Sequence, residues 1–598
     1  MAVQVGHASG IQPRTQEILH TLNIHHDLAA GGGGFAETAF WSNNNDDQQL
    51  QRLSVAAEIT NETMYRRVMI QHQGVTERVL DSELQKRGMS IQRPFELLRY
   101  EYTHSTSHPI RAFIKNGVSG EVERWDCKYM IAADGRQSRI RELAGISSTI
   151  NDTEATWAVG DFEAETDFPD LRRRCPVRTS HGNLMLIPSP HKTLRVYMLL
   201  NQEDTEELNN SIFEGKGNVS SSNGNHTTLL DLFERKLSAI FNPYTIKLNK
   251  VRWISRYIIS QRVADRFYDG RRLLFVGDSC HSHSPKAGQG MNTGIQDAYN
   301  LAWKLSLVLR NRATPDLLET YNLERKHIAQ QLIEFDMRFA KHFAELSSPE
   351  FYDIWKQNQG FTSGLGQHYP ANALIDDNIP AEIDHMAVEP LTPGKRYLPN
   401  TNLTRHIDGW ELTSMDVMPA NGEFHLVLFV GDISLEPRKT EFNSLYSTLT
   451  SPSSILTRLN GHPNPNTSPE KDAWPWEDIH TSRDHPPSSD KLLNLFVIHT
   501  ANHLHVELRP QYELWKYKFF EDREGFEHLR HGVDPKGSMM AAIVRPDGIV
   551  GMVRTEDGKL DGEVKGYFER SFLKGVPLKQ EGNVNRYHAK TNGTVDRM

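Results

Sequence analysis

The chain of 598 residues contains only three cysteines, none of them close to another in sequence. This spacing gives neither a disulfide framework nor a zinc pattern, and it suits a reducing compartment such as the cytoplasm. Two histidine pairs, 281/283 and 503/505, have the spacing of ligands on a strand, but no further ligand residues gather near them. We therefore expect no metal site and a cytoplasmic location.

Long apolar runs and an excess of positive charge are also missing. No apolar stretch is long enough to span a membrane, and no signal peptide opens the chain. The net charge of −9 gives no indication of a nucleic-acid or anionic membrane partner. With 38% hydrophobic and 24% charged residues, the composition is that of an ordinary globular protein. The length predicts several domains.

The most informative stretch is 271–310. Residues 273–276 form a short apolar run that predicts a buried strand, and Asp278 follows it directly. A glycine-containing loop leads into apolar residues at helical spacing. A carboxylate at a strand end can accept hydrogen bonds from hydroxyl groups. The order of strand, carboxylate, loop and helix therefore suits a polyol.

The loop itself suits a flat, electron-rich ring next to that polyol. Gly288 and Gly290 would let the backbone approach such a ring closely. The N–H groups of Gly290, Met291 and Asn292 would start the helix, where negative charge is favoured.

These residues carry a resemblance. Gly277, Asp278, Pro285 and the run 283–292 (HSPKAGQGMN) resemble the ribityl- and ring-binding motif of single-component FAD-dependent aromatic hydroxylases, and most of all the phenol hydroxylase branch. A second stretch, where an apolar strand runs into Asp134-Gly135 and basic residues, resembles the family's other fingerprint. The resemblance implies that Asp134 lies near the dinucleotide pyrophosphate.

Three further site residues follow from the resemblance. Gln73 stands where the family has a glutamine that reaches the ribityl chain, although a surface glutamine that caps a helix remains an alternative. Arg195 and Tyr197 match a pair in which the arginine touches the flavin and the tyrosine hydroxyl meets the phenol oxygen. They are two apart on a predicted strand and therefore face the same side. The alternative is a solvated sheet face.

Two positions depart from the family pattern. Ser9 stands where many members have an acidic residue that acts as a base toward the phenol, and Ser189 stands where many have arginine. A serine can hydrogen-bond but cannot take a proton at neutral pH. General-base help is typically worth about 10²–10⁴-fold, so we expect slower turnover, and the substrate could differ from simple phenol.

The unit that holds the ADP half of FAD, a strand, a GxGxxG turn and a helix, is not found. The four glycines at 31–34 have no apolar strand before them and no helix after them, so they predict a flexible loop. We expect the first βαβ unit to be absent and the Rossmann-like FAD-binding domain to be incomplete.

The predicted fold is a multidomain α/β and α+β protein that ends in a thioredoxin-like domain. That last domain resembles the C-terminal domain of phenol hydroxylases, which implies a homodimer, and it lacks the CxxC pair of dithiol chemistry. Polar segments at 203–226 and 462–490 predict mobile or disordered insertions. The predicted parts are the first FAD-binding segment (1–150), a β-sheet substrate domain (151–260), the second FAD-binding segment with helices and a linker (261–390), the thioredoxin-like dimerisation domain (391–575) and a disordered tail (576–598).

Two functions remain open at this stage. The resemblance implies an FAD- and NADPH-dependent monooxygenase that uses O₂ to hydroxylate a phenolic or related aromatic substrate through a flavin C4a-hydroperoxide. The alternative is a catalytically impaired, truncated homologue, or an incomplete gene model, that acts at most as a dimerising scaffold.

Overall fold

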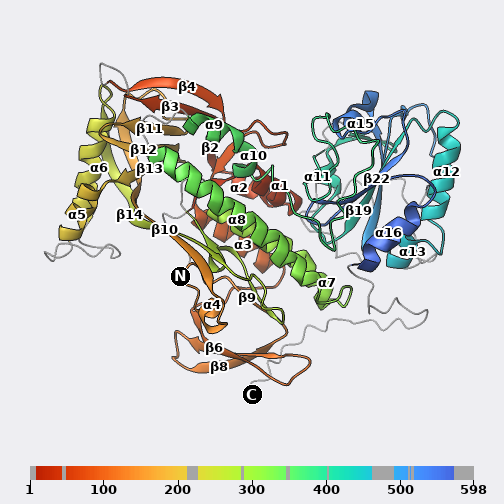
Figure 1. The fold of residues 1–598 in the computed structure, drawn as a ribbon, viewed down its shortest axis with the longest axis horizontal. Coiled ribbons are helices and arrows are strands. Elements are labelled where there is room, and N and C mark those ends of the chain that lie inside the picture. Colours follow the sequence, from red (N-terminus) through yellow and green to blue (C-terminus); the bar gives the residue numbers. More distant parts are fainter. Residues whose placement is uncertain are drawn as a thin grey trace.

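The computed structural model describes most of the chain, and its elements form a large N-terminal body and a C-terminal domain beside it (Figure 1). The described residues are 8–43, 49–211, 226–283, 288–344, 350–399, 403–460, 491–508, 512 and 518–570. The predicted disordered segments 462–490 and 576–598 lie outside these ranges.

The body is built around an eight-stranded sheet, and its long central strands β10 and β14 pair in antiparallel register. In spatial order the strands are β16 (His281–Ser282), β14 (Ile246–Ala264), β10 (Ser148–Thr166), β13 (Thr193–Leu200), β12 (Gly182–Pro188), β11 (Cys175–Thr179), β3 (Glu37–Ser42) and β4 (Gln51–Ala57). The predicted strands between 151 and 260 are therefore confirmed as parts of one sheet.

Side-chain alternation gives this sheet two different faces. Leu184 and Leu186 of β12 pack toward α5 (Gln202–Ser211) and α6 (His226–Ile240). Met185, between them in sequence, packs with residues of α8 (Leu317–Ala344) and α9 (Glu350–Gln357) on the opposite face. Figure 1 shows α5 and α6 at the outer side of the sheet, and α8 running across the body. The sheet is thus covered on both faces.

Smaller elements complete the body. A two-stranded parallel sheet joins β9 (Met130–Ala132) to β15 (Leu273–Phe275), and this confirms the buried strand predicted at 273–276. The other elements are β1 (Gly10–Ile11), α1 (Pro13–Thr21), α2 (His25–Ala29), β2 (Gly33–Phe35), β5 (Val68–Ile70), α3 (Gln73–Lys86), β6 (Phe95–Tyr102), β7 (Ile110–Asn116), β8 (Val122–Cys127), α4 (Arg139–Leu143), α7 (Gly290–Leu309) and α10 (Gln359–Thr362).

The C-terminal domain has a seven-stranded mixed sheet flanked by helices, and its thioredoxin-like character remains a prediction. Its spatial order is β18 (Glu411–Leu412), β17 (Leu403–Arg405), β21 (Phe519–Asp522), β20 (Leu493–His499), β19 (Phe424–Gly431), β22 (Met540–Val544) and β23 (Val550–Thr555). The helices are α11 (Ser414–Val417), α12 (Arg438–Leu449), α13 (Ile455–Asn460), α15 (Phe526–Arg530) and α16 (Leu560–Phe568).

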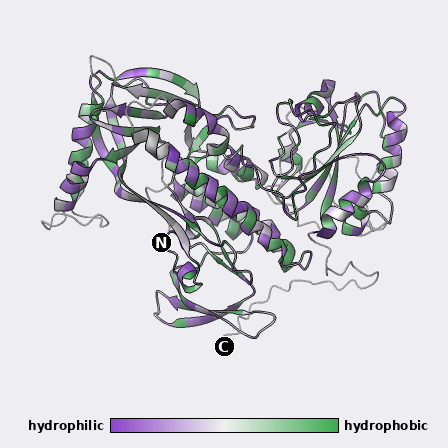
Figure 2. Ribbon diagram, viewed as in Figure 1, coloured by the Kyte–Doolittle hydropathy of each residue, from purple (hydrophilic) through white to green (hydrophobic). Residues whose placement is uncertain are grey.

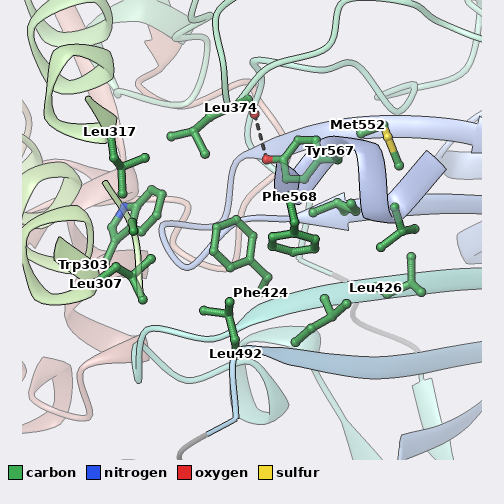
Figure 3. Close-up of a cluster of buried hydrophobic side chains, with 14 of the residues drawn as sticks. Trp303, Leu307, Leu317, Leu374, Phe424, Leu426, Leu492, Met552, Tyr567 and Phe568 are labelled. Carbon is green, nitrogen blue, oxygen red and sulfur yellow. Dashed lines mark hydrogen bonds between the residues drawn. The ribbon is translucent and has the colours of Figure 1, made fainter. Parts of the chain in front are cut away.

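Body and C-terminal domain share a hydrophobic core. Trp303 of α7 packs edge-on against Phe424 of β19, with ring centroids 5.5 Å apart. Figure 3 shows Trp303 and Leu307 pointing from α7 toward Phe424 and Phe568 of the C-terminal domain. The two parts therefore pack directly against each other and are not joined by a linker alone.

A buried group of four charges crosses the same junction; we call Lys304, Glu324, Arg545 and Asp547 the interdomain cluster. Glu324 of α8 accepts hydrogen bonds from Arg545 at 2.7 and 2.9 Å and from the Lys304 ammonium at 2.7 Å. Arg545 also donates to Asp547 at 2.6 Å. The charges balance, and each side chain has a partner within the cluster.

Two predictions about loops are wrong. Gly33 and Gly34 belong to β2, which pairs with β5, because β5 supplies the backbone partners that the glycine run itself does not reveal. A Cβ atom on Gly34 would lie 2.5 Å from the Val68 carbonyl oxygen, so the close approach of these strands requires glycine. Residues 203–211 are helical in α5, where Asp204 pairs with Lys236 of α6 at 2.9 Å; residues 212–225 lie outside the described ranges.

Hydropathy follows this architecture. In Figure 2 many helices carry apolar residues and polar residues side by side, as expected of helices that cover a core on one side only. Among the helices that the structure describes, none combines the length and apolar character needed to cross a membrane.

Candidate active site

The two sequence fingerprints meet at one sheet edge. Strands β9 and β15 run parallel with Ala132 opposite Phe275, so Asp134 and Asp278 both follow the carboxyl ends of neighbouring strands. The Arg141 guanidinium joins the two loops, since its Nη1 donates to the Ser279 carbonyl at 2.5 Å. Ligands of open α/β sheets bind at this edge.

The two carboxylates differ in their surroundings. Asp134 accepts hydrogen bonds from the Ser138 hydroxyl at 2.6 Å and from the Ile140 N–H at 3.0 Å, so it holds the first turn of α4. Asp278 is exposed and has no hydrogen-bond partner among the described residues. Asp278 is therefore the carboxylate that is free to accept hydrogen bonds from ligand hydroxyls.

The start of α7 fits an electron-rich ring. No side chain caps this 20-residue helix, so the N–H groups of Gly290, Met291 and Asn292 offer positive potential. Gly288 is exposed and has φ +60°, a conformation that favours glycine. Pro285 lies outside the described residues. Together with Asp278, this turn fits the ribityl chain and ring of a flavin.

Asn292 ties the turn at 288–292 to the N-terminal segment. Its amide oxygen accepts from the Gln12 N–H at 2.8 Å, and its amide nitrogen donates to the carbonyls of Gly10 and Gly288, each at 2.8 Å. Met291 packs with Ile11 in a small core cluster. The side chains of Asn292 and Met291 thus position the turn, while its backbone N–H groups remain at the helix start.

Gln73 is the first residue of α3 and is half-buried. Its amide oxygen accepts from the Ala8 N–H at 3.3 Å, and its amide nitrogen donates to Glu77 at 3.0 Å. The side chain therefore binds neighbouring protein groups in this structure, and its contact with a ribityl chain remains a prediction.

Arg195 and Tyr197 lie on β13, on the face of the sheet that looks toward α8. Arg195 is only 1% exposed, which excludes the alternative of a solvated sheet face for this residue. Its Nε and Nη2 each donate to one oxygen of Asp161 at 2.7 Å, and its Nη1 donates to the Ser9 hydroxyl at 3.1 Å. We call Arg195 and Asp161 the sheet pair.

The sheet pair is a product of strand register. Asp161 of β10 stands directly opposite Arg195 of β13, and Val159 stands opposite Tyr197. Directly opposed residues on antiparallel strands have side chains on the same face. Burial alone would lower the pKa of Arg195, but interactions with the Tyr197 hydroxyl and with Asp161 raise it overall, so the guanidinium stays charged.

The sheet face and the turn at 288–292 lie on either side of one short segment. Ser9 accepts from Arg195, and its neighbour Gly10 accepts from Asn292. The structure therefore brings the predicted substrate residues and the predicted ring-binding residues together through two consecutive residues.

Several neighbours of this site carry no recognisable motif in the sequence. The ring centroid of Trp253 lies 5.7 Å from the Arg195 guanidinium carbon. Burial raises the pKa of Tyr257, with a further contribution from Tyr197. Burial also lowers the pKa of His72, and Asp161 acts in the opposite direction. The only sequence signal for Asp161 was an acidic residue within an apolar strand, which is easily read as part of a polar face.

A buried cluster of three potential metal-ligand side chains lies next to the Gly277-Asp278 turn. Cys280, His281 and Asp297 offer potential metal-ligand atoms within 4.8 Å of one another. Asp297, however, already accepts from Arg325 Nε at 2.6 Å and from the Gly277 N–H at 3.1 Å, and it pairs with His281 at 2.7 Å. Burial alone would raise the pKa of Asp297, but Arg325 and His281 lower it overall. The carboxylate therefore anchors the turn.

Comparison with known families identifies the family to which the chain belongs. Residues 1–336 match the family described as FAD binding domain, and residues 367–575 match the phenol hydroxylase C-terminal dimerisation domain. The chain belongs to the FAD-dependent aromatic monooxygenases of the phenol hydroxylase type. This confirms the predicted family, enzyme class, fold class and FAD cofactor.

Several relatives are similar over much of the chain. A phenol 2-monooxygenase of Aspergillus fumigatus (fsqG) is 30% identical over 469 residues, covering 75% of this chain and 71% of the relative. An FAD-dependent monooxygenase of Aspergillus terreus (terD) is 26% identical and covers 98% of this chain and 92% of its own length. A 3-hydroxybenzoate 4-monooxygenase of Comamonas testosteroni is 32% identical over 53% of this chain and 50% of the relative.

Solved structures share the fold at lower identity. The flavin-dependent monooxygenase PieE, solved with FAD and substrate, superposes with a TM-score of 0.64 at 18% identity, covering 95% of this chain and 93% of that one. Aklavinone-11 hydroxylase, solved with FAD and aklavinone, gives the same TM-score of 0.64 at 17% identity and covers 95% of this chain and 92% of that one.

Proposed function

We propose that this monooxygenase hydroxylates a phenolic ring held between the sheet face of Arg195 and Tyr197 and the turn at 288–292. The observation that supports this most is the Ser9-Gly10 segment, which contacts Arg195 on one side and Asn292 on the other. A ring placed there would lie beside both the tyrosine hydroxyl and the start of α7.

In this proposal bound FAD would supply the redox chemistry, with NADPH as the reductant and O₂ as the source of the transferred oxygen atom. The residues of the chain supply position and charge. Asp278 would accept hydrogen bonds from the ribityl hydroxyls, and the N–H groups at 290–292 would stabilise negative charge on the ring. The Tyr197 hydroxyl orients the phenol oxygen. Asp134 contributes by holding α4 near the dinucleotide.

The match to the dimerisation domain supports a further proposal, that two copies associate through residues 367–575. Light scattering of the purified chain should give twice the monomer mass. A monomer at micromolar concentration would contradict this part of the proposal and leave the chemistry untouched.

The proposed chemistry is tested with purified protein that has been supplied with FAD. We expect phenol or a substituted phenol to accelerate NADPH oxidation and a hydroxylated product to appear in step with it. An Asp278→Ala variant should bind FAD more weakly. The scaffold alternative predicts that no phenol changes the rate and that no product forms.

A further inference from the structure

The buried guanidinium beside Tyr197 is already neutralised. Both Nε and Nη2 of Arg195 are taken by Asp161 at 2.7 Å, and Nη1 is taken by the Ser9 hydroxyl. The side chains of Arg195 and Asp161 are 1% and 2% exposed. A paired Arg and Asp at this burial present no net charge to a ligand.

His72, which interacts electrostatically with both members of the sheet pair, does not restore a positive charge. Burial lowers the pKa of His72, so this half-buried ring stays neutral at neutral pH. Ser9 carries no charge, and it is itself only 5% exposed. The aromatic residues on this face, Tyr197 and Tyr257, offer hydroxyls and ring surfaces.

A ligand carboxylate could reach this site in only two ways. It could lie beside the intact sheet pair, where it would lose its hydration and gain no free cation. It could instead displace Asp161 from Arg195, which would leave the Asp161 carboxylate buried without its partner. Both routes are costly compared with binding an uncharged ring.

We propose that Asp161 is a specificity-determining residue: by occupying Arg195 it restricts this site to uncharged phenols and excludes hydroxybenzoate-type acids. This inference rests on the proposed function and adds the charge class of the substrate. It also explains how an arginine can stand next to the substrate tyrosine without serving as a carboxylate anchor.

Three meta-substituted phenols of similar size test the inference on the wild-type protein. These are 3-methylphenol, 3-hydroxybenzyl alcohol and 3-hydroxybenzoate, of which only the last is charged at neutral pH. Their dissociation constants are measured by calorimetry on FAD-supplied protein, without turnover. We expect the alcohol to bind at least about tenfold more tightly than the acid, because the acid would lose the hydration of its carboxylate without gaining a cationic partner. The alcohol separates the effect of charge from that of polarity.

An Asp161→Asn variant sharpens the test. It keeps the shape of the side chain and frees the Arg195 charge, so the preference should shift toward the acid by about tenfold to a hundredfold. The matched control is Asp170→Asn, which removes another carboxylate, 1% exposed, that pairs with Arg173 at 2.8 Å. We expect this control to lose stability but to keep the wild-type preference.

The outcomes separate the two proposals. If the wild-type protein binds 3-hydroxybenzoate as tightly as the alcohol, the specificity inference is wrong and the phenol site stands. If none of the three compounds binds, both proposals are wrong. If Asp161→Asn fails to fold, the wild-type series still decides the question.

Discussion

The sheet pair and the interdomain cluster are both buried, charge-balanced groups, yet they stand in different settings. The interdomain cluster lies at the packed junction between the body and the C-terminal domain. There Glu324 accepts hydrogen bonds from both Lys304 and Arg545, and Asp547 accepts another from Arg545. The sheet pair lies beside a serine and a tyrosine hydroxyl, and Gly10, the residue after that serine, bonds to Asn292 of the turn at 288–292. Burial of charge therefore does not by itself mark an active site; what lies next to the charge does.

Removing the central carboxylate of the interdomain cluster should have the largest effect. Glu324→Ala would leave Lys304 and Arg545 buried without their common partner. We expect a loss of about 3–5 kcal/mol in the free energy of unfolding, measured by urea denaturation. Glu334→Ala, an exposed position on the same helix, is the control. Equal stability of the two variants would show that the cluster contributes nothing to the junction.

Acid should weaken the C-terminal domain next. Burial, with a smaller contribution from Lys518, lowers the pKa of His425 to about 3; burial and Arg530 lower that of His531 to about 3. Below about pH 6.5 these two histidines become protonated in the unfolded chain but stay neutral in the folded domain. Stability is therefore lost as pH falls from 6.5 toward 3, by roughly 1.4 kcal/mol per pH unit per histidine.

Urea denaturation between about pH 7 and pH 5 measures this slope. His425→Gln should lower the slope of the unfolding free energy against pH, because about one proton fewer is taken up on unfolding. A stability that does not change over this range would contradict the neutral, buried state of both histidines.

At Tyr197, beside the sheet pair, the expected effect of a substitution is on activity and not on folding. Tyr197→Phe removes the hydroxyl that we place on the phenol oxygen, so kcat/KM should fall by about tenfold to a hundredfold. The control is Tyr446→Phe, because the buried Tyr446 hydroxyl has no hydrogen-bond partner among the described residues. If both variants keep full activity, Tyr197 does not hold the substrate.

The smallest expected effect is again at the junction. The Tyr299 hydroxyl donates to the Pro546 carbonyl at 3.1 Å, and this bond joins α7 to the loop that carries Arg545 and Asp547. Tyr299→Phe should cost about 1 kcal/mol in the free energy of unfolding and leave the Kd for phenol unchanged. A change in phenol affinity would show that the junction and the site are coupled.

Local patterns allowed much of the fold to be predicted. The strand before Asp278 and the helix after Gly290 follow from apolar spacing, and both are confirmed as β15 and α7. The predicted β-strands of the substrate layer are confirmed as one sheet. Strand β2 was missed because a glycine run has no apolar pattern, and its pairing with β5 depends on residues far along the chain.

The site was predicted in part, for a related reason. Family motifs indicated Asp134, Asp278 and the turn at 288–292, and the structure places them at one sheet edge. Asp161 has no motif around it, and its partnership with Arg195 arises only from the register of β10 and β13. The interdomain cluster escaped prediction because its four charges come from α7, α8 and a C-terminal loop, which meet only in the folded chain.

The most direct measurement is the fate of isotopically labelled O₂ in a reaction with FAD-supplied protein, NADPH and an uncharged phenol. If the ring lies between Tyr197 and the turn at 288–292, the product should carry one labelled oxygen atom on the ring, in proportion to the NADPH consumed. NADPH oxidation that yields only labelled hydrogen peroxide, at a rate independent of the phenol, would contradict this account.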